Sequence, residues 1–379
     1  MAAAGLNKRT IVVLGIALCT LVLGAVDASV ARTAGGKLAT GPRLPAVVHR
    51  GTSLPPPAQS KPVPLVIALH ESGGNPQEFE QSTGLDAAAD KHGFVVAYLG
   101  DLAPGSPAWT LVNMPANLAY VSSEITQLTA QENIDPTRVY VTGFSAGATM
   151  TFFVGCQLSS QVDGIAVASG AMRFSDPCKL AHPVSELLFI GTNDAIPLNG
   201  SAVLLSATQV AARWRGLDSC TAQSSSSTAG PVTQTVWNSC DDSAGVELDV
   251  TAGGTHQWSA NGAERVWAFF AAHPGMSATA PSAALSSVAV HRSRAKLSVQ
   301  AAFSVGEAQV ALRVTVKRGG RTVTSKAFTL ARSTRQAVVL QLPAKAAGGR
   351  YSLSLALTDS YGRRLTAVRS VTVPSRPKS

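Results

Sequence analysis

The sequence predicts an α/β fold with a mostly parallel, doubly wound sheet, followed by a small all-β domain. Short apolar runs alternate with segments of helical periodicity as far as residue 273, a pattern typical of parallel sheets covered by helices. From about residue 285 the apolar periodicity becomes two, which favours antiparallel strands. The charge changes sign at the same place: beyond residue 273, 17 Lys and Arg stand against two acidic residues, a net +15, and the rest carries −6 of the total of +9. Two domains with different partners are expected.

The N-terminus has the pattern of an export signal. Lys8 and Arg9 precede an apolar run over 11–26, and small residues then offer cleavage sites after Ala28 or Ala31. The alternative is a membrane anchor, but the run is shorter than the ~20 residues that span a bilayer. We expect residues 1–31 to be a cleaved signal peptide and the mature protein to be secreted.

A flexible leader, residues 32–62, is rich in Gly, Pro, Ala and Ser and includes one short strand near 46–49. The expected α/β domain, residues 63–273, follows. Continuous apolar runs predict strands buried on both faces, at 65–70, 94–99, 139–142, 165–169, 187–190 and 246–250. Helical spacing predicts helices at 85–92, 117–131, 147–158, 203–215 and 264–272.

Residues 274–284 are small, polar and proline-bearing, as expected of a linker. A basic β-sandwich resembling immunoglobulin or fibronectin type III domains is expected over 285–374, with a short tail at 375–379. Its strands are predicted at 296–303, 310–316, 322–328, 337–342, 351–357 and 365–373.

Removal of the signal leaves an even number of cysteines, which in an exported chain predicts two disulfides. The cysteines are Cys156, Cys178, Cys220 and Cys240. Three pairings exist in principle, and pairing of sequence neighbours, 156–178 and 220–240, is the natural one. A zinc site is the alternative, but the spacings contain no C-x-x-C.

The central motif is Gly143-Phe144-Ser145-Ala146-Gly147, between a predicted strand and an apolar helix. A serine at such a strand-to-helix turn projects its hydroxyl above the sheet, and the backbone N–H that follows points at a developing oxyanion. Ser145 is therefore the candidate nucleophile. The alternative is a glycine-rich turn with a surface serine.

A nucleophilic serine needs a base, and the base needs an orienting acid. In this arrangement the acid and the histidine follow the serine in that order, on loops after later strands. Asp194 follows the strand predicted at 187–190, and His256 follows the one at 246–250. His182 and His273 lack this placement. We expect Ser145, His256 and Asp194 to form a catalytic triad that needs no metal or organic cofactor.

The loop after the first buried strand reads His70-Glu71-Ser72-Gly73-Gly74. The backbone N–H groups of Ser72 and Ala146 are the expected oxyanion-hole donors, and His70 is expected to shape the loop. Trp109 and Trp258 flank the presumed cleft. They either contact the substrate or are packed aromatic residues.

These segments together resemble the poly(3-hydroxybutyrate) depolymerase and feruloyl esterase-like family of α/β-hydrolases. The matching segments are residues 65–70 with Gly73-Gly74, 86–94, 134–143, the Ser145 turn, Cys156, 191–194 and 254–258. The resemblance covers roughly residues 62–272. It implies an exported ester hydrolase with a Ser145–Asp194–His256 triad.

Two positions depart from the family pattern. Glu71 stands where the family usually has glycine after the loop histidine, and a carboxylate there opposes an oxyanion unless it points away. Ala116-Asn117 replaces the usual paired aspartates, although Asn117 can still cap a helix. These departures put substrate preference in question more than reaction class.

The basic domain lacks tryptophan, and its few aromatic residues, Phe303, Phe328, Tyr351 and Tyr361, are widely spaced. Sugar-binding modules and single-strand binders need stacking platforms, so both are disfavoured and no specific nucleic acid is expected. The charges either are solvated outer faces or attach the protein to an anionic surface such as a cell-wall polymer.

The leading hypothesis is therefore a secreted serine carboxylic-ester hydrolase whose substrate, polymeric or not, is a polyhydroxyalkanoate or a feruloyl or acetyl polysaccharide ester. Glu71 motivates one alternative, a catalytically degenerate hydrolase scaffold that binds at the cell envelope. The other alternative is acyl transfer to an envelope acceptor.

Overall fold

The structure is a computed structural model that describes residues 45–100, 109, 113–196, 198–275, 281, 283–293, 296–343, 345–359 and 362–375, without the side chains of residues 307, 308 and 334. The expected signal peptide, residues 1–31, lies outside the described residues, as do parts of the expected leader and linker. Within the described residues, no helix is both long and apolar enough to cross a membrane.

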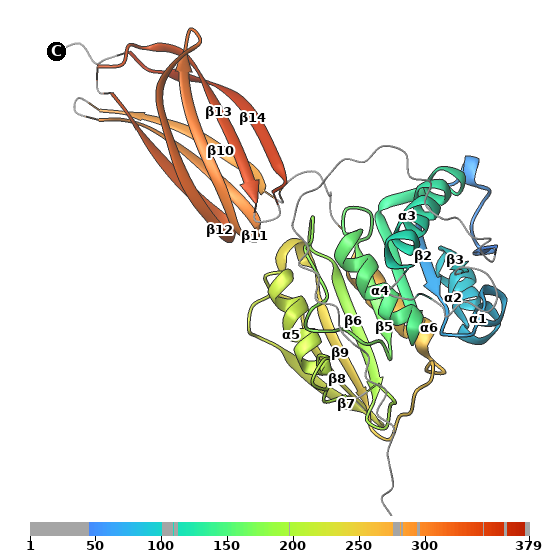
Figure 1. The fold of residues 1–379 in the computed structure, drawn as a ribbon. Coiled ribbons are helices and arrows are strands. Elements are labelled where there is room, and N and C mark those ends of the chain that lie inside the picture. Colours follow the sequence, from blue (N-terminus) through green and yellow to red (C-terminus); the bar gives the residue numbers. More distant parts are fainter. Residues whose placement is uncertain are drawn as a thin grey trace, which may run out of the picture. The chain divides into compact units, whose positions relative to one another are not determined.

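The first part of the chain forms one nine-stranded sheet (Figure 1), in the order β1-β3-β2-β4-β5-β6-β9-β8-β7. The six central strands are parallel, and β1, β8 and β7 pair antiparallel at the two edges. The strands are β1 Val47–Arg50, β2 Val63–Leu69, β3 Val95–Leu99, β4 Ile134–Phe144, β5 Gly164–Ala168, β6 Ser185–Gly191, β7 Ser225–Ala229, β8 Val232–Trp237 and β9 Val246–Thr251. The predicted mostly parallel sheet is confirmed.

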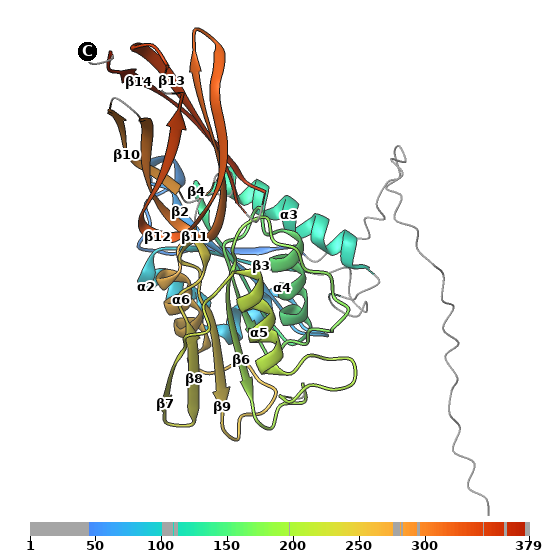
Figure 2. The same ribbon diagram turned by 90° about the vertical axis from the view of Figure 1, so that its left-hand side faces the viewer.

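Helices cover both faces of this sheet. They are α1 Pro76–Thr83, α2 Leu85–His92, α3 Met114–Gln131, α4 Ala146–Gln157, α5 Ala207–Leu217 and α6 Gly262–Ala272, with 3-10 turns at Pro57–Gln59 and Asp241–Ser243. Figure 2 shows α3, α4 and α5 on one side and α2 and α6 on the other. Each side encloses its own apolar core, because parallel strands with apolar residues at every position must be buried on both faces.

Most predicted elements lie within a few residues of their expected bounds. The helix expected at 203–215 begins at Ala207, because Ser206 and Gln209 form a capping box and Val203 is exposed. Helix α1 and the hairpin β7–β8 were not predicted. Strand β7 has the sequence SSSTA and is exposed throughout, so no apolar signal reveals it.

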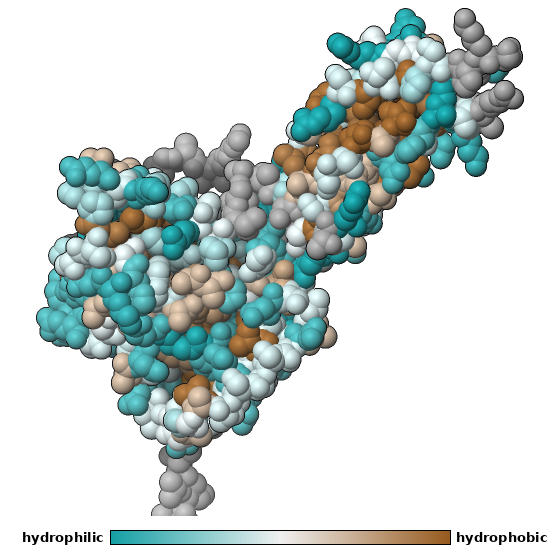
Figure 3. Space-filling view, turned by 180° about the vertical axis from the view of Figure 1, so that it is seen from behind, coloured by the Kyte–Doolittle hydropathy of each residue, from teal (hydrophilic) through white to brown (hydrophobic). Residues whose placement is uncertain are grey.

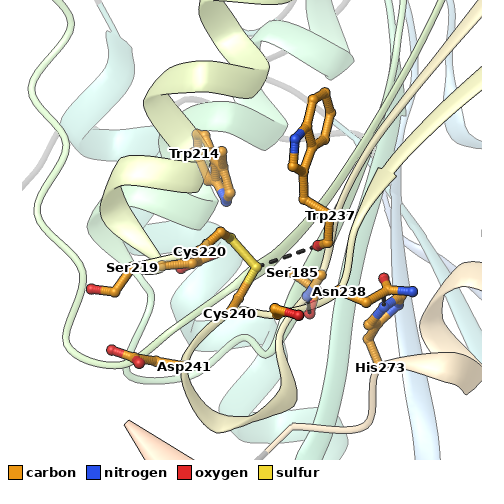
Figure 4. The surroundings of a disulfide bond; sticks show 12 residues. Ser185, Trp214, Ser219, Cys220, Trp237, Asn238, Cys240, Asp241 and His273 are labelled. Carbon is orange, nitrogen blue, oxygen red and sulfur yellow. Dashed lines mark hydrogen bonds between the residues drawn. A yellow bond between two sulfur atoms is a disulfide. The ribbon is translucent and has the colours of Figure 1, made fainter. Parts of the chain in front are cut away.

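Both disulfides join sequence neighbours, as expected. They are Cys156–Cys178 and Cys220–Cys240. Cys220 follows the C-terminal end of α5, and Cys240 lies just before the 3-10 turn that begins at Asp241 (Figure 4). This bridge therefore closes the loop that contains the β7–β8 hairpin and holds the end of that loop beside the C-terminal end of α5.

The second part of the chain is a five-stranded antiparallel sheet that curves around one apolar core. Its strands are β10 Ala283–Arg292, β11 Leu297–Arg318, β12 Arg321–Leu342, β13 Gly349–Asp359 and β14 Arg364–Val373. The four strands predicted over 296–342 are thus two long ones. Irregularities between Phe303 and Gln309 bend β11, so that one half pairs with β10 and the other with β13.

This domain is therefore one nearly barrel-shaped sheet rather than two separate sheets, and β10 begins inside the expected linker. The two ends of the sheet, β10 and β14, leave a cavity of about 500 Å³ between them. Figure 3 shows apolar side chains gathered on one face of this domain. The domain boundaries expected from the sequence stay predictions.

Candidate active site

Ser145 lies at a sharp turn between the end of β4 and the start of α4. Its backbone has φ 54° and ψ −113°, a left-handed conformation that a non-glycine residue adopts only where its surroundings impose it. Its N–H donates to the carbonyl oxygen of Ala168, 3.0 Å away at the end of β5. This geometry is the strand–turn–helix arrangement that the motif requires.

The two glycines of the motif are needed for close packing. A Cβ on Gly143 would lie 2.5 Å from the carbonyl carbon of Gly147, and a Cβ on Gly147 would lie 2.0 Å from the carbonyl oxygen of Leu69. Any side chain at either position would push α4 away from β4 or β2. The N-terminus of α4 therefore lies directly against the end of β2, where the expected oxyanion loop begins.

The structure brings Ser145, His256 and Asp194 together although they are far apart in sequence. The hydroxyl of Ser145 lies 2.8 Å from Nε2 of His256, and Nδ1 of His256 lies 2.7 Å from Oδ1 of Asp194. The carboxylate of Asp194 is fully buried, whereas the His256 side chain is 29% exposed. The imidazole thus stands between a buried acid and an accessible hydroxyl.

Two further groups fix the carboxylate of Asp194. The hydroxyl of Ser169 donates to its Oδ2 at 2.5 Å, and the backbone N–H of Ile196 donates to its Oδ1 at 2.7 Å. Ser169 follows β5 and has φ 55°. Sequence reasoning missed Ser169, because a single serine after a predicted strand carries no motif.

The loops that carry Asp194 and His256 are joined by backbone contacts. Asn193 N–H donates to the carbonyl oxygen of Gly254 at 2.8 Å, and Gly253 N–H donates to the hydroxyl of Thr192 at 2.8 Å. A Cβ on Gly191 would lie 2.1 Å from the Gly254 carbonyl oxygen. This packing fixes the acid and the base relative to each other at the carboxyl ends of β6 and β9.

The expected oxyanion loop is a tight turn after β2. The buried His70 donates from Nδ1 to the carbonyl oxygen of Glu71 at 2.7 Å, and Gly74 N–H donates to the same oxygen at 3.2 Å. The Glu71 side chain folds back over Gly74, because a Cβ there would lie 3.1 Å from its Oε1. Ser72 is exposed on this turn.

Ala146 is the first residue of α4. The first four N–H groups of an α-helix lack an acceptor within the helix, and the helix dipole adds partial positive charge at this end. The N–H of Ala146 is thus placed directly after Ser145 and has no intrahelical partner.

The two tryptophans expected at the cleft have structural contacts. Trp109 is 3% exposed and belongs to the apolar core, and its Nε1–H donates to the carbonyl oxygen of His70. Trp258 donates to the Thr83 carbonyl oxygen and meets Phe79 and Phe189 edge-on. These contacts favour packing for both indoles, and the hydrogen bond from Trp109 holds His70 at the start of the expected oxyanion loop.

His182 and His273, the other histidines considered for the role of base, are buried. Each is hydrogen-bonded to a nearby backbone carbonyl oxygen. Burial lowers the pKa of both imidazoles. Across the described ranges, no cluster of three or more His, Cys, Asp or Glu side chains is arranged to hold a metal ion.

The fold and the Ser145–His256–Asp194 arrangement define an α/β-hydrolase. Residues 49–182 match the family model described as esterase PHB depolymerase. This part of the chain is therefore similar to a family of carboxylic ester hydrolases, which confirms the resemblance seen in the sequence.

Named relatives include the putative esterase NocK of Nocardia uniformis subsp. tsuyamanensis, 30% identical over 38% of this chain and 44% of the relative. Feruloyl esterase B of Piromyces equi is 27% identical over 52% of this chain and 40% of its own length. A bifunctional acetylxylan esterase/xylanase of Neocallimastix patriciarum is 28% identical over 54% and 30%. The chain thus spans less than half the length of these relatives.

Among solved structures, the acetyl xylan esterase from Aspergillus awamori is similar to this chain. It has a TM-score of 0.47 and 14% identity, and the match covers 60% of this chain and 93% of that structure.

Proposed function

We propose that this protein is a serine carboxylesterase that acts through an acyl intermediate on Ser145. The observation that carries the proposal is an unbroken pair of hydrogen bonds. One joins the Ser145 hydroxyl to His256 Nε2 at 2.8 Å, and the other joins His256 Nδ1 to the buried Asp194 carboxylate at 2.7 Å. A base within hydrogen-bond reach of a hydroxyl, oriented by an acid, is the requirement for nucleophilic catalysis by serine.

In the first half-reaction, Ser145 Oγ attacks the ester carbonyl carbon while its proton passes to His256 Nε2. The tetrahedral intermediate then expels the alcohol, which takes that proton, and acyl-Ser145 remains. In the second half-reaction, water loses a proton to His256 and attacks the acyl carbon, and the acid leaves as Ser145 recovers its proton. Asp194 accepts the Nδ1–H of His256, which holds the imidazole in the tautomer that these steps need.

The negative oxygen of each tetrahedral intermediate is assigned to the backbone N–H groups of Ala146 and Ser72. The close approach of α4 to the end of β2 at Gly147 supports this pair, because it puts the two segments side by side. Each such donor contributes about 3–4 kcal/mol of transition-state stabilisation in serine hydrolases. The contact of the Glu71 carboxylate with Gly74 keeps this side chain against its own turn.

The substrate class we propose is a feruloyl or acetyl polysaccharide ester, or a polyhydroxyalkanoate, on the ground of the family and the named relatives. An extracellular location is proposed with it, because the two disulfides are stable in oxidising compartments.

The test is hydrolysis of p-nitrophenyl acetate and butyrate by the wild type and by Ser145→Ala. We expect the wild type to release p-nitrophenol with saturable kinetics and the variant to lose at least about 1,000-fold in kcat. A folded wild type without turnover would instead support the degenerate binding scaffold. A rate that increases with an added alcohol acceptor, with ester as the product, would support acyl transfer.

We also propose that the β-domain attaches the enzyme to an anionic polymer surface. Strand pairing puts Arg313, Lys317, Arg350 and Arg364 on the outward face of the sheet, among Ser, Thr and Ala side chains. Asp359, the acidic side chain that the structure describes in this domain, is buried against Arg363. The exposed face is therefore cationic.

Elution from a heparin column in a salt gradient tests this second proposal. Replacement of Arg313, Lys317, Arg350 and Arg364 by serine is expected to lower the eluting salt concentration clearly, because screened charge attraction is lost. The control is Lys61→Ser, an exposed lysine before β2, which is expected to elute with the wild type. Equal elution of the two variants would contradict the proposal.

A further inference from the structure

A cavity of about 250 Å³ lies on the α6 side of the sheet, beside its β7 edge. Strand pairing explains its lining, because Gln234 pairs with both Ser227 and Asp249 and all three face the same side. The residues around it are Phe189, Ser227, Ala229, Val232, Gln234, Asp249, Thr251, Ser259, Asn261, Gly262 and Arg265. The cavity is thus built from four strands and the start of α6.

This cavity adjoins the catalytic loop. A smaller cavity of about 100 Å³ shares Phe189, Thr251 and Ser259 with it. The lining of the smaller cavity also includes Thr255 and Gln257, the two residues on either side of His256. A ligand in the larger cavity would therefore lie next to the loop that positions the candidate base.

The larger cavity contains a buried carboxylate oxygen without a partner. Asp249 is 4% exposed. Its Oδ2 accepts from Arg265 Nε at 2.7 Å, whereas Oδ1 has no hydrogen-bond partner among the described residues. An unsatisfied buried acceptor destabilises the folded state, and more so if it is charged. A ligand that donates a hydrogen bond to Oδ1 would remove this cost.

The carboxylate of Asp249 already has a cationic partner in Arg265. Arg265 contacts both Asp249 and Glu247, so its single positive charge offsets half of the charge of the two carboxylates. Burial raises the pKa of Asp249 to about 6, and the neighbouring Gln234 amide partly opposes that shift. The ion pair with Arg265 favours the carboxylate form of Asp249, whose Oδ1 is an acceptor suited to a hydroxyl group.

The rest of the lining resembles a surface for a polyol ring. Hydroxyls come from Ser227, Thr251 and Ser259, and amides from Gln234 and Asn261. Phe189 supplies an apolar face. The volume lies just below the range of about 300–1,000 Å³ for ligand pockets, so it suits one ring rather than an extended acyl chain.

We propose that this cavity binds a sugar ring of an ester-bearing polysaccharide, with Asp249 accepting from a ring hydroxyl. The proposal rests on the esterase activity proposed for Ser145 and narrows its substrates to carbohydrate esters. It accounts for the hydroxyl-rich β7–β8 hairpin, which contributes little to the apolar core.

The test is the substitution Ala229→Phe, whose larger side chain would fill the cavity that Ala229 lines. The matched control is Thr228→Phe, since Thr228 lies on the opposite face of the same strand, where its hydroxyl contacts Thr233. Binding of xylotetraose is measured by titration calorimetry or ligand-observed NMR, which needs no turnover. We expect wild type and Thr228→Phe to bind within twofold of each other and Ala229→Phe to bind at least 10-fold more weakly.

Asp249→Asn is the second variant, because it keeps the shape of the side chain and removes the charged acceptor. It is expected to weaken xylotetraose binding about 5- to 10-fold. Wild type that does not bind xylotetraose, or Ala229→Phe that binds it as tightly as wild type, would overturn the proposal. Ser145-dependent hydrolysis of p-nitrophenyl acetate is followed in parallel, so that failure of the sugar site is distinguished from failure of the esterase proposal.

Discussion

Ser169→Ala removes one of the three hydrogen bonds that fix Asp194. The donors are the Ser169 hydroxyl at 2.5 Å, Ile196 N–H at 2.7 Å and His256 Nδ1–H at 2.7 Å. A hydrogen bond to a charged group contributes about 1.5–3 kcal/mol. If that amount is lost in the transition state, where His256 is protonated, kcat falls about 10- to 100-fold at about 1.4 kcal/mol per tenfold.

The assay is steady-state hydrolysis of p-nitrophenyl butyrate, with kcat and KM measured separately. KM is expected to stay within about twofold, because the Ser169 side chain acts on substrate only through Asp194 and His256. The matched control is Ser185→Ala, another buried serine, whose hydroxyl accepts from Gly245 N–H outside the site. It is expected to lower stability without lowering kcat. A folded Ser169→Ala variant with wild-type kcat would refute this reasoning.

Three other changes have defined outcomes. Gly147→Ala puts a Cβ 2.0 Å from the Leu69 carbonyl oxygen, and the displaced turn is expected to lower kcat about 100-fold. Replacement of Cys220 and Cys240 by alanine opens a loop with a sequence separation of 20 and is expected to lower the free energy of unfolding in urea by about 3 kcal/mol. Burial raises the pKa of Asp163 to about 7 from 3.8, so the native state keeps a proton that the unfolded state has lost. Wild-type stability therefore falls between about pH 4 and pH 7, and Asp163→Asn gains over it by up to about 4 kcal/mol above pH 8.

Controls separate these effects from general damage. Gly216→Ala in α5 meets no neighbour within 4 Å and is expected to keep kcat and gain up to about 1 kcal/mol in stability. For Asp163→Asn, the informative quantity is the difference from wild type across pH, because the other buried groups contribute equally to both. A difference that does not change between pH 5 and pH 8 would contradict the assigned cause.

The parts of the fold that were predictable from sequence are those with an apolar signal. The run at Leu65–His70 and its counterparts could only be strands buried on both faces, and their alternation with helices implied a parallel sheet. Strand β7 was not predicted because Ser225–Ala229 is polar and exposed. It is a strand only through its pairing with β8. Strand β11 was expected as two strands, because its bend near Val305 interrupts the apolar pattern without ending the pairing.

The residues of the candidate site likewise include some that were predictable from the sequence and some that were not. Ser145, Asp194 and His256 were recognisable because each lies at a fixed place relative to a strand. Ser169 was not, since its role depends on a contact with Asp194 across 25 residues of sequence. The direction of the Glu71 side chain and the burial of Trp109 were also not predictable from the sequence, because both depend on packing in the folded protein.

Covalent labelling by a fluorophosphonate tests the central claim most directly. The reagent reacts with a serine only where a base activates it, and peptide mass mapping locates the adduct. We expect one adduct, on Ser145, in the wild type, none in Ser145→Ala, and much slower labelling in His256→Gln. A folded wild type that stays unlabelled, or an adduct on another residue, would contradict the assignment of Ser145 as the nucleophile.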